Sequence, residues 1–348
     1  MRVLVTGHLG YIGPSVVRQL KEAGHTVKGL DIGYFADCVS DESRLMRPDS
    51  EVVKDVRDVD ARDLEGLDAV VHLAALSNDP MGELDPALTH NINTGGAKRV
   101  AKAALEAGVR RFAFASSCSI YGSSGIEGLV DETAMMAPLT AYAQSKVDTE
   151  AALTELMAKG LEPVFLRNAT AFGLSGRTRF DLVVQNLFGW AHQHNVVRVL
   201  SDGTPWRPLT HIEDIAAGCV AAVEAPADKV AGQAFNIGRQ DANYQVKDIA
   251  QAVAALAGGA KLEITGEAGN DPRSYRVNFA KSRDRLPGFA PAWTLERGCE
   301  EIARWLRDGG LADEAFDSRR FIRLKQLKHL LEKQQVDQHL RWDHSRAA

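Results

Sequence analysis

Tyr142 and Lys146 are two residues whose types and spacing predict acid/base chemistry. They stand four residues apart in the segment YAQSK, which opens a predicted helix, so both side chains project from one face. A free phenol has a pKa of about 10 and is a poor base at neutral pH, but a nearby ammonium stabilises the phenolate. Ser117, which directly follows a predicted strand, could hydrogen-bond the same substrate oxygen. Because such a pair also arises by chance on helix surfaces, its meaning depends on the surrounding elements.

The first forty residues predict the element that would place a dinucleotide beside this pair. Residues 2–5 form an apolar strand, which leads into a glycine turn (TGHLGYIG) and then into an amphipathic helix ending near Gly24. Gly7 permits the tight turn, Gly10 allows the backbone to approach a pyrophosphate, and Gly13 lets the helix lie close to the strand. The free N–H groups at the start of the helix would then face the phosphates.

Two acidic residues are predicted to hold the adenosine of that dinucleotide. Asp31 ends the second strand and could accept hydrogen bonds from both ribose hydroxyls while repelling a 2′-phosphate. The next two residues, Ile32 and Gly33, bring no cation that could hold such a phosphate, so NAD is favoured over NADP. Asp55 is placed to accept from the adenine amino group, with the backbone of Val56 beside it. Either carboxylate could instead be a solvated acid.

Strands and helices alternate along the first 170 residues. Apolar runs at 51–53, 69–73, 112–115 and 163–166 are predicted strands, with a helix at 94–107 among them. This alternation predicts an α/β fold with a doubly wound parallel sheet, in which ligands bind at the carboxyl ends of the strands. The candidate contacts after the strands are Asp55–Val56, Ala74–Ala75, Ser116–Ser117 and Asn168–Thr170.

Composition excludes several classes of protein. The chain has 348 residues, 45% hydrophobic and 25% charged, and a formal net charge of −5, which is ordinary for a soluble enzyme. It has no apolar run of about 18 residues and no visible signal peptide, so we expect no membrane partner. The acidic balance argues against a nucleic-acid partner. The four cysteines form no CxxC pair, which predicts a cytoplasmic location and no metal site.

With these motifs in place, the sequence resembles the extended short-chain dehydrogenase/reductase superfamily, and within it the NAD-dependent nucleotide-sugar epimerase/dehydratase family. The resemblance covers roughly residues 1 to 300. The matching segments are TGHLGYIG at 6–13, HLAA at 72–75, Asn93, SSCSIYG at 116–122, YAQSK at 142–146, Leu166-Arg167, Asn186-Leu187, RPLTHIED at 207–214 and FNIG at 235–238.

The resemblance implies a Rossmann-type NAD-binding domain and a smaller C-terminal α/β domain that grips the substrate. We expect residues 1–172 with 209–240 to form the first domain, and 173–208 with 241–311 to form the second. Residues 312–348 are expected to be a helical C-terminal extension, where the resemblance fades. The apolar helical stripe in this extension could pack on the chain's own domain or form a dimer contact.

The resemblance also assigns roles around the cofactor. Tyr142 is the implied acid/base, Lys146 lowers its pKa and binds the cofactor ribose, and Ser117 shares the reacting oxygen. Asn93 resembles the asparagine that supports the active-site helix. The implied NAD contacts are Gly7, Gly10, Tyr11, Ile12, Gly13, Asp31, Asp55, Val56, Leu73, Ala74, Ala75, Asn93, Ser116, Tyr142 and Lys146.

The implied substrate is a nucleotide-diphosphate sugar. Arg207 resembles the arginine that clamps its diphosphate, because a guanidinium suits bidentate phosphate binding. Two departures concern this site: Thr170 replaces a usual asparagine, and an arginine usual near residue 268 is missing, where Arg273 or Arg276 could serve. The implied substrate contacts are Ser117, Thr170, Asn186, Leu187, Arg207, Arg273 and Arg276.

The two residues after Ser117 narrow the function. The related dehydratases and decarboxylases carry acids in this stretch, whereas Cys118 and Ser119 are not acids, so water loss lacks its proton shuttle. We therefore expect a nucleotide-sugar epimerase that transiently oxidises C4 to a 4-keto sugar and returns the hydride, working as a homodimer through the family's usual helices. A dehydrogenase or 4-ketoreductase with net hydride transfer is the alternative. A non-catalytic NAD-sensing protein is a third.

Two further features have more than one interpretation. The loop at 173–180 holds Arg177 and Arg179, which could clasp an anionic substrate or be solvated charges. Trp206, beside Arg207, could line the sugar or nucleotide pocket or fill the junction between domains.

Overall fold

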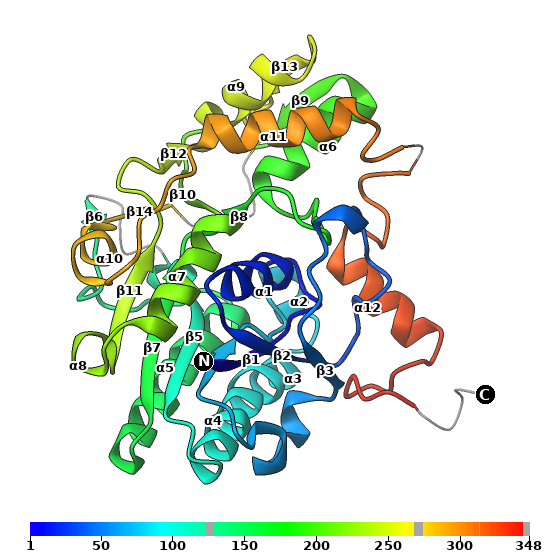
Figure 1. The fold of residues 1–348 in the computed structure, drawn as a ribbon. Helices are drawn as coiled ribbons and strands as arrows, with labels where there is room; N and C mark the ends of the chain where they lie inside the picture. The colour runs from blue at the N-terminus through cyan, green and yellow to red at the C-terminus, as the bar shows by residue number, and fades with distance from the viewer. Residues whose placement is uncertain (123–127, 268–273, 313, 344–348) are drawn as a thin grey trace.

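A seven-stranded parallel sheet forms the centre of the protein, in a computed structural model that describes residues 1–122, 128–267, 274–312 and 314–343 (Figure 1). Chain order reverses between β1 and β4, which creates the switch point where such sheets bind ligands. In spatial order the strands are β11 (Gln233–Ile237), β7 (Glu162–Asn168), β5 (Arg111–Ser117), β4 (Ala69–His72), β1 (Arg2–Thr6), β2 (Thr26–Asp31) and β3 (Ser50–Val53). Every neighbouring pair is parallel, so the predicted Rossmann-type fold class is confirmed.

The apolar runs form strands because both faces of the sheet are covered. Val3, Leu4 and Val5 of β1 are all fully buried. Val3 and Val5 belong to one core cluster, and Leu4 belongs to another on the opposite face. A strand buried on both sides reads as a continuous hydrophobic run rather than as an alternating one.

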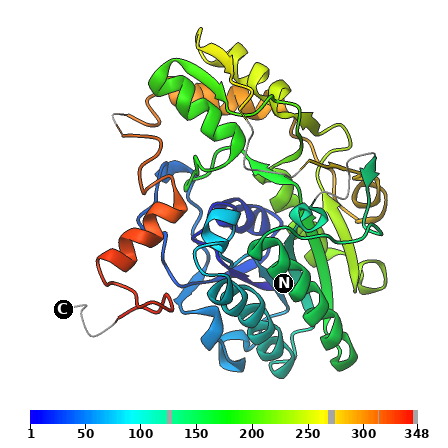
Figure 2. The same cartoon turned by 180° about the vertical axis from the view of Figure 1, so that it is seen from behind.

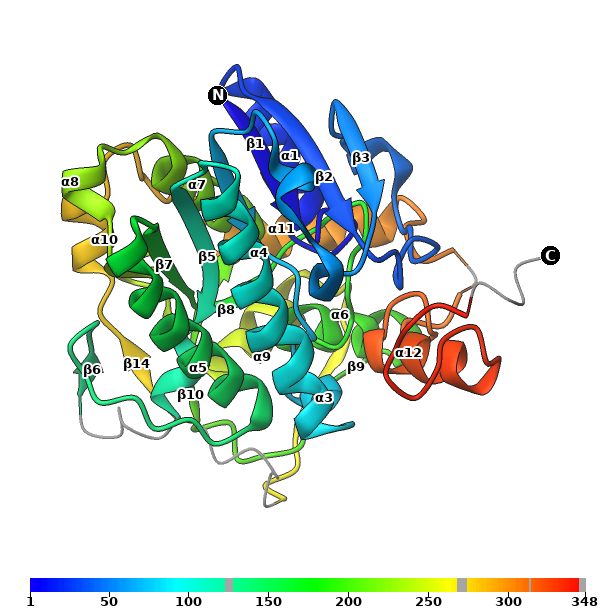
Figure 3. The same cartoon turned by 90° about the horizontal axis from the view of Figure 1, so that it is seen from below.

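Helices cover both faces of the large sheet. On one face α1 (Gly13–Glu22) packs against α7 (Ile212–Glu224), and both contribute to the cluster of Val3. On the other face, α3 (Pro86–His90) and α4 (Gly96–Glu106) follow each other end to end through a π-helical turn at 91–95, and α5 (Ala141–Leu156) lies beside them in Figure 3. The short helices α8 (Ala227–Val230) and α10 (Ala280–Arg285) pack on the edge strand β11, whereas α2 (Asp79–Gly82) contacts α5 and α12.

A smaller unit with its own core lies beyond the carboxyl ends of the strands. Its core is formed by α6 (Val183–His194), α9 (Val246–Leu256), α11 (Leu295–Arg307) and the parallel pair β9 (Val196–Val199) and β13 (Lys261–Ile264). A three-stranded sheet joins it to the large sheet, and consists of β8 (Thr170–Phe172), β10 (Trp206–His211) and β12 (Asn243–Gln245).

One segment of the predicted substrate domain packs elsewhere. The strand β14 (Arg276–Val277) pairs with β6 (Leu129–Val130). Further along, Leu286 and Phe289 join the core between the large sheet and α7. Residues 276–289 therefore lie against the large sheet, although the predicted division places them with the smaller unit.

The last helix, α12 (Arg323–Glu332), returns to the beginning of the chain. In Figures 1 and 2 it lies beside the blue segment that follows β2. Leu327 and Leu330 are buried in a cluster with Tyr34 and Met81, so its apolar stripe packs on the chain's own domain. None of the helices in the described ranges has the length and apolar character that a membrane crossing requires.

Candidate active site

A cavity of about 520 Å³ opens at the carboxyl ends of the central strands. It gathers residues that are far apart in the sequence, which the switch point of the sheet explains. The predicted site residues that line it are Gly7, Gly10, Tyr11, Ile12, Gly13, Asp31, Asp55, Val56, Leu73, Ala74, Ala75, Ser116, Ser117, Tyr142, Lys146, Thr170 and Arg207. Asn93, Asn186, Leu187 and Arg276 are not among the lining residues, and Arg273 lies outside the described residues.

The glycine turn has the geometry that a bound diphosphate requires. Gly7 has a φ of +77°, and a Cβ added there would lie 2.7 Å from the backbone nitrogen of Ala74. A Cβ on Gly13 would lie 2.2 Å from the carbonyl oxygen of His8. The N-cap residue of α1, Ile12, supplies no side-chain hydrogen bond, so the first N–H groups of the helix remain available to a ligand.

Asp31 is held in position at the end of β2. Its two carboxylate oxygens accept hydrogen bonds from the backbone of Leu9 at 3.0 Å and of Gly33 at 2.8 Å. Burial raises the pKa of Asp31, while the hydrogen bonds and the nearby Arg177 oppose that shift. Arg177 Nη1 donates to the carbonyls of Phe35 and Ala36 at 2.7 and 2.5 Å. Sequence reasoning named Arg177 as a possible substrate contact but did not place it near Asp31, because it comes from a distant loop.

Asp55 already has two arginine partners. Arg57 donates to both of its oxygens, at 2.6 Å from Nη2, and Arg341 Nη1 lies 3.2 Å from Oδ2. Adenine recognition by the Asp55 side chain therefore remains a prediction, with these contacts in competition. Val56, directly after it, lines the cavity.

Tyr142 and Lys146 lie on the first turns of α5, as their spacing predicts. Thr140 caps the helix by accepting from the backbone N–H of Ala143 at 3.2 Å. Lys146 Nζ donates to the carbonyl of Ala115 at 2.7 Å and lies 5.6 Å from the centre of the Tyr142 ring. Burial lowers the pKa of Lys146 to about 7. The pair therefore combines a phenol near a helix N-terminus with a buried amine.

Behind this pair lies a buried polar network that sequence reasoning missed. Glu150, one helical turn after Lys146, accepts from Ser116 Oγ at 2.6 Å and pairs with Arg167 at 2.7 Å. Arg167 continues the network to the phenol of Tyr121 at 3.1 Å. The signal for Glu150 was the same four-residue helical step that identified Lys146.

Asn93 supports the active-site helix from a π-helical turn, η4 (Asn91–Gly95). Its side-chain oxygen accepts from the backbone N–H of Leu76 at 2.8 Å, and its amide donates to Ser145 Oγ at 2.9 Å. Since Leu76 lines the cavity and Ser145 precedes Lys146, Asn93 joins the loop after β4 to α5 without touching the cavity.

The loop at 173–181 lies against the glycine turn, and its arginines are buried rather than solvated. Arg177 is 6% exposed and Arg179 4%. Arg179 pairs with Asp181 at 2.8 Å, and both line the cavity. The phenol of Tyr11 donates to the carbonyl of Gly173 at 2.7 Å, which fastens this loop to the turn.

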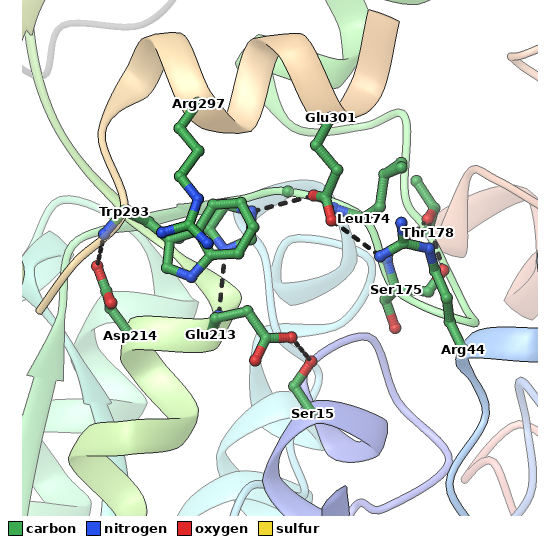
Figure 4. Close-up of polar contacts among 12 residues, drawn as sticks. Ser15, Arg44, Leu174, Ser175, Thr178, Glu213, Asp214, Trp293, Arg297 and Glu301 are labelled. Atoms are coloured by element: carbon green, nitrogen blue, oxygen red, sulfur yellow. Dashed lines mark hydrogen bonds and ion pairs between the residues drawn. The ribbon is translucent and has the colours of Figure 1, made fainter. Parts of the chain in front are cut away.

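Helix α11 anchors the beginning of the same loop (Figure 4). Glu301 accepts from the backbone N–H of Leu174 at 3.3 Å and pairs with Arg44 at 2.9 Å. It also lies 3.3 Å from Nε2 of His211, whose ring stacks on Trp293 at 3.8 Å. This cluster joins the smaller unit to the loop that borders the cavity.

The predicted substrate residues are only partly brought together. Leu187 is buried in the core of the smaller unit, and the amide of Asn186 donates to the carbonyl of Phe180 at 3.0 Å. Residues 182 and 183, one helical turn earlier, line the cavity instead. Arg276 lies over the ring of Trp206 at 5.2 Å, and neither of them lines the cavity.

The two residues after Ser117 differ in their surroundings. Cys118 is fully buried and its thiol donates to the carbonyl of Arg167 at 3.1 Å, whereas Ser119 lines the cavity. Neither residue supplies a carboxylic acid. In the ranges that the structure describes, no group of three or more His, Cys, Asp or Glu side chains is arranged to hold a metal ion.

Comparisons with known proteins agree with this geometry. The model of the NAD dependent epimerase/dehydratase family matches residues 3–238. The uncharacterized UDP-glucose epimerase YtcB of Bacillus subtilis (strain 168) is 27% identical over 320 residues, covering 87% of this chain and 97% of its own. A UDP-glucose 4-epimerase of Corynebacterium glutamicum is 28% identical over 336 residues, covering 90% and 98%.

A solved structure shares the fold over nearly the whole chain. MoeE5 in complex with UDP-glucuronic acid and NAD is 26% identical, with a TM-score of 0.76, and the match covers 89% of this chain and 100% of that one. The family model alone spans more than half of this chain and includes both the glycine turn and the Tyr142–Lys146 pair. The chain therefore belongs to the NAD dependent epimerase/dehydratase family and is an NAD-dependent enzyme.

Proposed function

We propose that the protein is a nucleotide-sugar 4-epimerase, which inverts the C4 hydroxyl of a sugar nucleotide with no net oxidation. The observation that carries this proposal is that Tyr142, Lys146 and Ser117 share one cavity with Asp31 and the glycine turn. The 4-epimerase names of the relatives support it further.

The residues that line the cavity fit NAD. The glycine turn and the uncapped start of α1 would hold the diphosphate, Asp31 the adenosine ribose, and Lys146 the nicotinamide ribose. The chemistry that NAD supplies when bound is the reversible acceptance of a hydride.

Tyr142 would remove and return the proton of the C4 hydroxyl. The N-terminus of α5 and the ammonium form of Lys146 both favour a phenolate at this position. Ser117 Oγ accepts from the backbone N–H of Ser119 at 3.1 Å, so its own proton can be donated to the same sugar oxygen. The chain thus offers one proton acceptor and one fixed donor to a single hydroxyl.

The residues after Ser117 favour epimerisation over dehydration. Loss of water needs an acid that protonates the departing hydroxyl. The thiol of Cys118 donates its hydrogen bond to the carbonyl of Arg167, and burial raises the pKa of this thiol well above the ordinary value. Ser119 reaches the cavity as a neutral hydroxyl.

For the substrate we propose a UDP-sugar, with Arg207 on its diphosphate and Thr170 near the sugar. Both residues line the cavity, and relatives are named for UDP-sugars. We also propose the division into an NAD-binding and a substrate domain, a homodimer, and a cytoplasmic location, which the four buried free thiols support. Sedimentation of the purified protein measures the oligomeric state.

The test is incubation of the full chain with UDP-, TDP-, GDP- and CDP-sugars in deuterated water. We expect inversion at C4 with no solvent deuterium in the product and no accumulation of reduced cofactor. Deuterium at C3 or C5, a dehydrated product, or stoichiometric use of the cofactor would overturn the proposal.

A pair of Tyr→Phe variants tests the role of the Tyr142 phenol. Tyr142→Phe is expected to lower kcat by about 100-fold or more, because general acid/base catalysis contributes about that much. Tyr244→Phe removes the same atom from the smaller unit, outside the cavity, and is expected to keep full activity. Equal activity of the two variants would exclude Tyr142 as the acid/base.

A further inference from the structure

One residue of the C-terminal extension lines the cavity. Arg323, the first residue of α12, is 1% exposed and borders the same cavity as Asp31 and the glycine turn. It belongs to the part of the chain where the family resemblance fades, so the family pattern assigns it no role.

Arg323 is held in place by uncharged partners. Its guanidinium donates to the carbonyl of Arg177 at 2.7 Å and to that of Arg320 at 2.9 Å, and it lies 5.0 Å from the centre of the Phe35 ring. These contacts fix the planar group and leave further N–H donors. A preorganised guanidinium of this kind suits bidentate binding of a phosphate.

Arg323 shares the nearby carboxylate of Asp181 with Arg179, and Asp181 favours the charge of both. No carboxylate of the described residues forms an ion pair with it. The nearby Asp181 already pairs with Arg179 at 2.8 Å and accepts from Asn78 at 3.0 Å. Burial lowers the pKa of Arg323 to about 10, and the neighbouring arginines 177 and 179 contribute to that shift. A buried cation whose nearby carboxylate already pairs with another arginine is costly, and a bound anion would reduce that cost.

The position of Arg323 favours the cofactor as the source of that anion. Phe35, under its guanidinium, follows Asp31 by four residues at the end of β2. Arg177, whose carbonyl it contacts, lies near Asp31 and also donates to Phe35. Arg323 thus stands beside the segment predicted to hold the adenosine ribose, to which the dinucleotide's phosphates are attached.

We propose that Arg323 binds the diphosphate of the dinucleotide, so that the C-terminal extension supplies part of the cofactor site. The proposal rests on the NAD dependence of the family and not on which sugar is epimerised. The anion-binding set then comprises the start of α1 from the beginning of the chain and Arg323 from its end.

The end of the described chain braces this arrangement. Trp342 Nε1 donates to the carbonyl of Ile32 at 2.6 Å, and the phenol of Tyr34 donates to the carbonyl of Leu340. Arg57 Nη1 donates to the carbonyl of His339 at 3.0 Å. These bonds attach the extension to the loops after β2 and β3, which border the adenosine end of the cavity.

The test compares ligands with and without phosphate on the cofactor-free full chain. Arg323→Met keeps the length of the side chain and removes its charge. Calorimetry should show NAD and ADP-ribose binding weakened by about 10- to 100-fold, the range expected for a lost charge-assisted hydrogen bond. Binding of adenosine, which has no phosphate, should be unchanged, and so should binding of UDP.

Lys325→Met is the matched control, because Lys325 lies on the same helix and pairs only with the exposed Asp317 among the described residues. It should bind all four ligands like the wild type. Arg323→Lys, which keeps the charge but not the planar fork, should recover part of the affinity and serves as the second variant if Arg323→Met does not fold.

Three results would overturn the proposal. The first is an unchanged affinity for NAD and ADP-ribose in a folded variant. The second is an equal loss of affinity for adenosine, which would mean that Arg323 has a structural role. The third is a loss of affinity confined to UDP, which would assign Arg323 to the substrate. None of these measurements depends on epimerase activity, so failure here is distinct from failure of the proposed function.

Discussion

At the scale of single residues, burial gives Lys146 its chemical character. The residue is 4% exposed and its amine donates to the carbonyl of Ala115 at 2.7 Å, while Glu150 one turn away favours the charged form. Desolvation is the larger effect and brings the pKa to about 7. In the cofactor-free chain this lysine therefore changes charge near neutral pH.

This shift predicts a pH dependence of stability in the cofactor-free protein. Between pH 7 and about 10.5 the unfolded chain holds a proton on Lys146 that the folded chain has released, so the free energy of unfolding rises with pH. Lys146→Met removes this contribution of up to about 1.4 kcal/mol per pH unit. Urea unfolding at pH 7, 8, 9 and 10 should show the variant's advantage over the wild type shrinking as pH rises.

Lys102→Met, on the exposed face of α4, is the control for this measurement. Its stability relative to the wild type should be independent of pH. A constant difference between Lys146→Met and the wild type would mean that Lys146 keeps its proton in the folded chain.

The relative position of two site residues could be predicted from the sequence when both lie on the same helix or strand. Tyr142 and Lys146 could be paired from sequence because four residues on a helix fix their relative direction. Arg177 and Arg323 could not be placed, because they reach Asp31 and Phe35 through tertiary contacts across more than 140 residues. No local pattern encodes such an approach.

At the scale of elements, the glycine turn shows how little space the first βα unit leaves. The start of α1 lies so close to the preceding turn that Gly13 has the carbonyl of His8 where a Cβ would be. Close approach at this point brings the helix N-terminus to the cavity. The packing requirement and the binding requirement therefore fall on the same residue.

Gly13→Ala is expected to destabilise the protein by several kcal/mol and to weaken NAD binding, because the new methyl would lie 2.2 Å from that carbonyl oxygen. Overpacking typically costs about 1–3 kcal/mol or more. Gly95→Ala is the control, since its nearest neighbour would be 3.9 Å away, and it should be neutral or slightly stabilising. Urea unfolding and NAD titration measure both effects, and equal behaviour of the two variants would contradict this account.

The centre of the sheet was predictable because strands such as β1 and β4 are buried on both faces and read as apolar runs. The register of α6 was harder to predict. Asn186 and Leu187 match a family pattern, but α6 begins at Val183 and turns Leu187 into the core, so the cavity is reached one turn earlier. A helix start that lacks a side-chain cap leaves little signal for its register in the sequence.

At the scale of the whole molecule, the two ends of the chain form one structure. The buried cluster of Tyr34, Leu327 and Leu330 joins the segment after β2 to α12. Trp342 and Arg341 also contact the loops that border the cavity, through the carbonyl of Ile32 and the carboxylate of Asp55. Occupation of the cavity and attachment of α12 should therefore be linked, since each stabilises the other.

Hydrogen exchange measures this linkage. Saturating NAD is expected to slow amide exchange in α12 more than in α11, which packs in the core of the smaller unit away from the Arg323 contact. The reason is that ligand binding lowers the population of the state in which α12 is detached. Protection confined to the glycine turn, with α12 unchanged, would show that the two are independent.

The placement of Arg323 and Trp342 has a consequence for biosynthesis. During translation β1, α1 and Asp31 are synthesised first, and Arg323 and Trp342 follow more than 290 residues later. Until Arg323 and Trp342 have been synthesised, the nascent polypeptide thus carries a nucleotide pocket that lacks part of its wall. Premature termination or proteolysis before Arg323 would yield a chain that keeps its central sheet but binds the dinucleotide weakly.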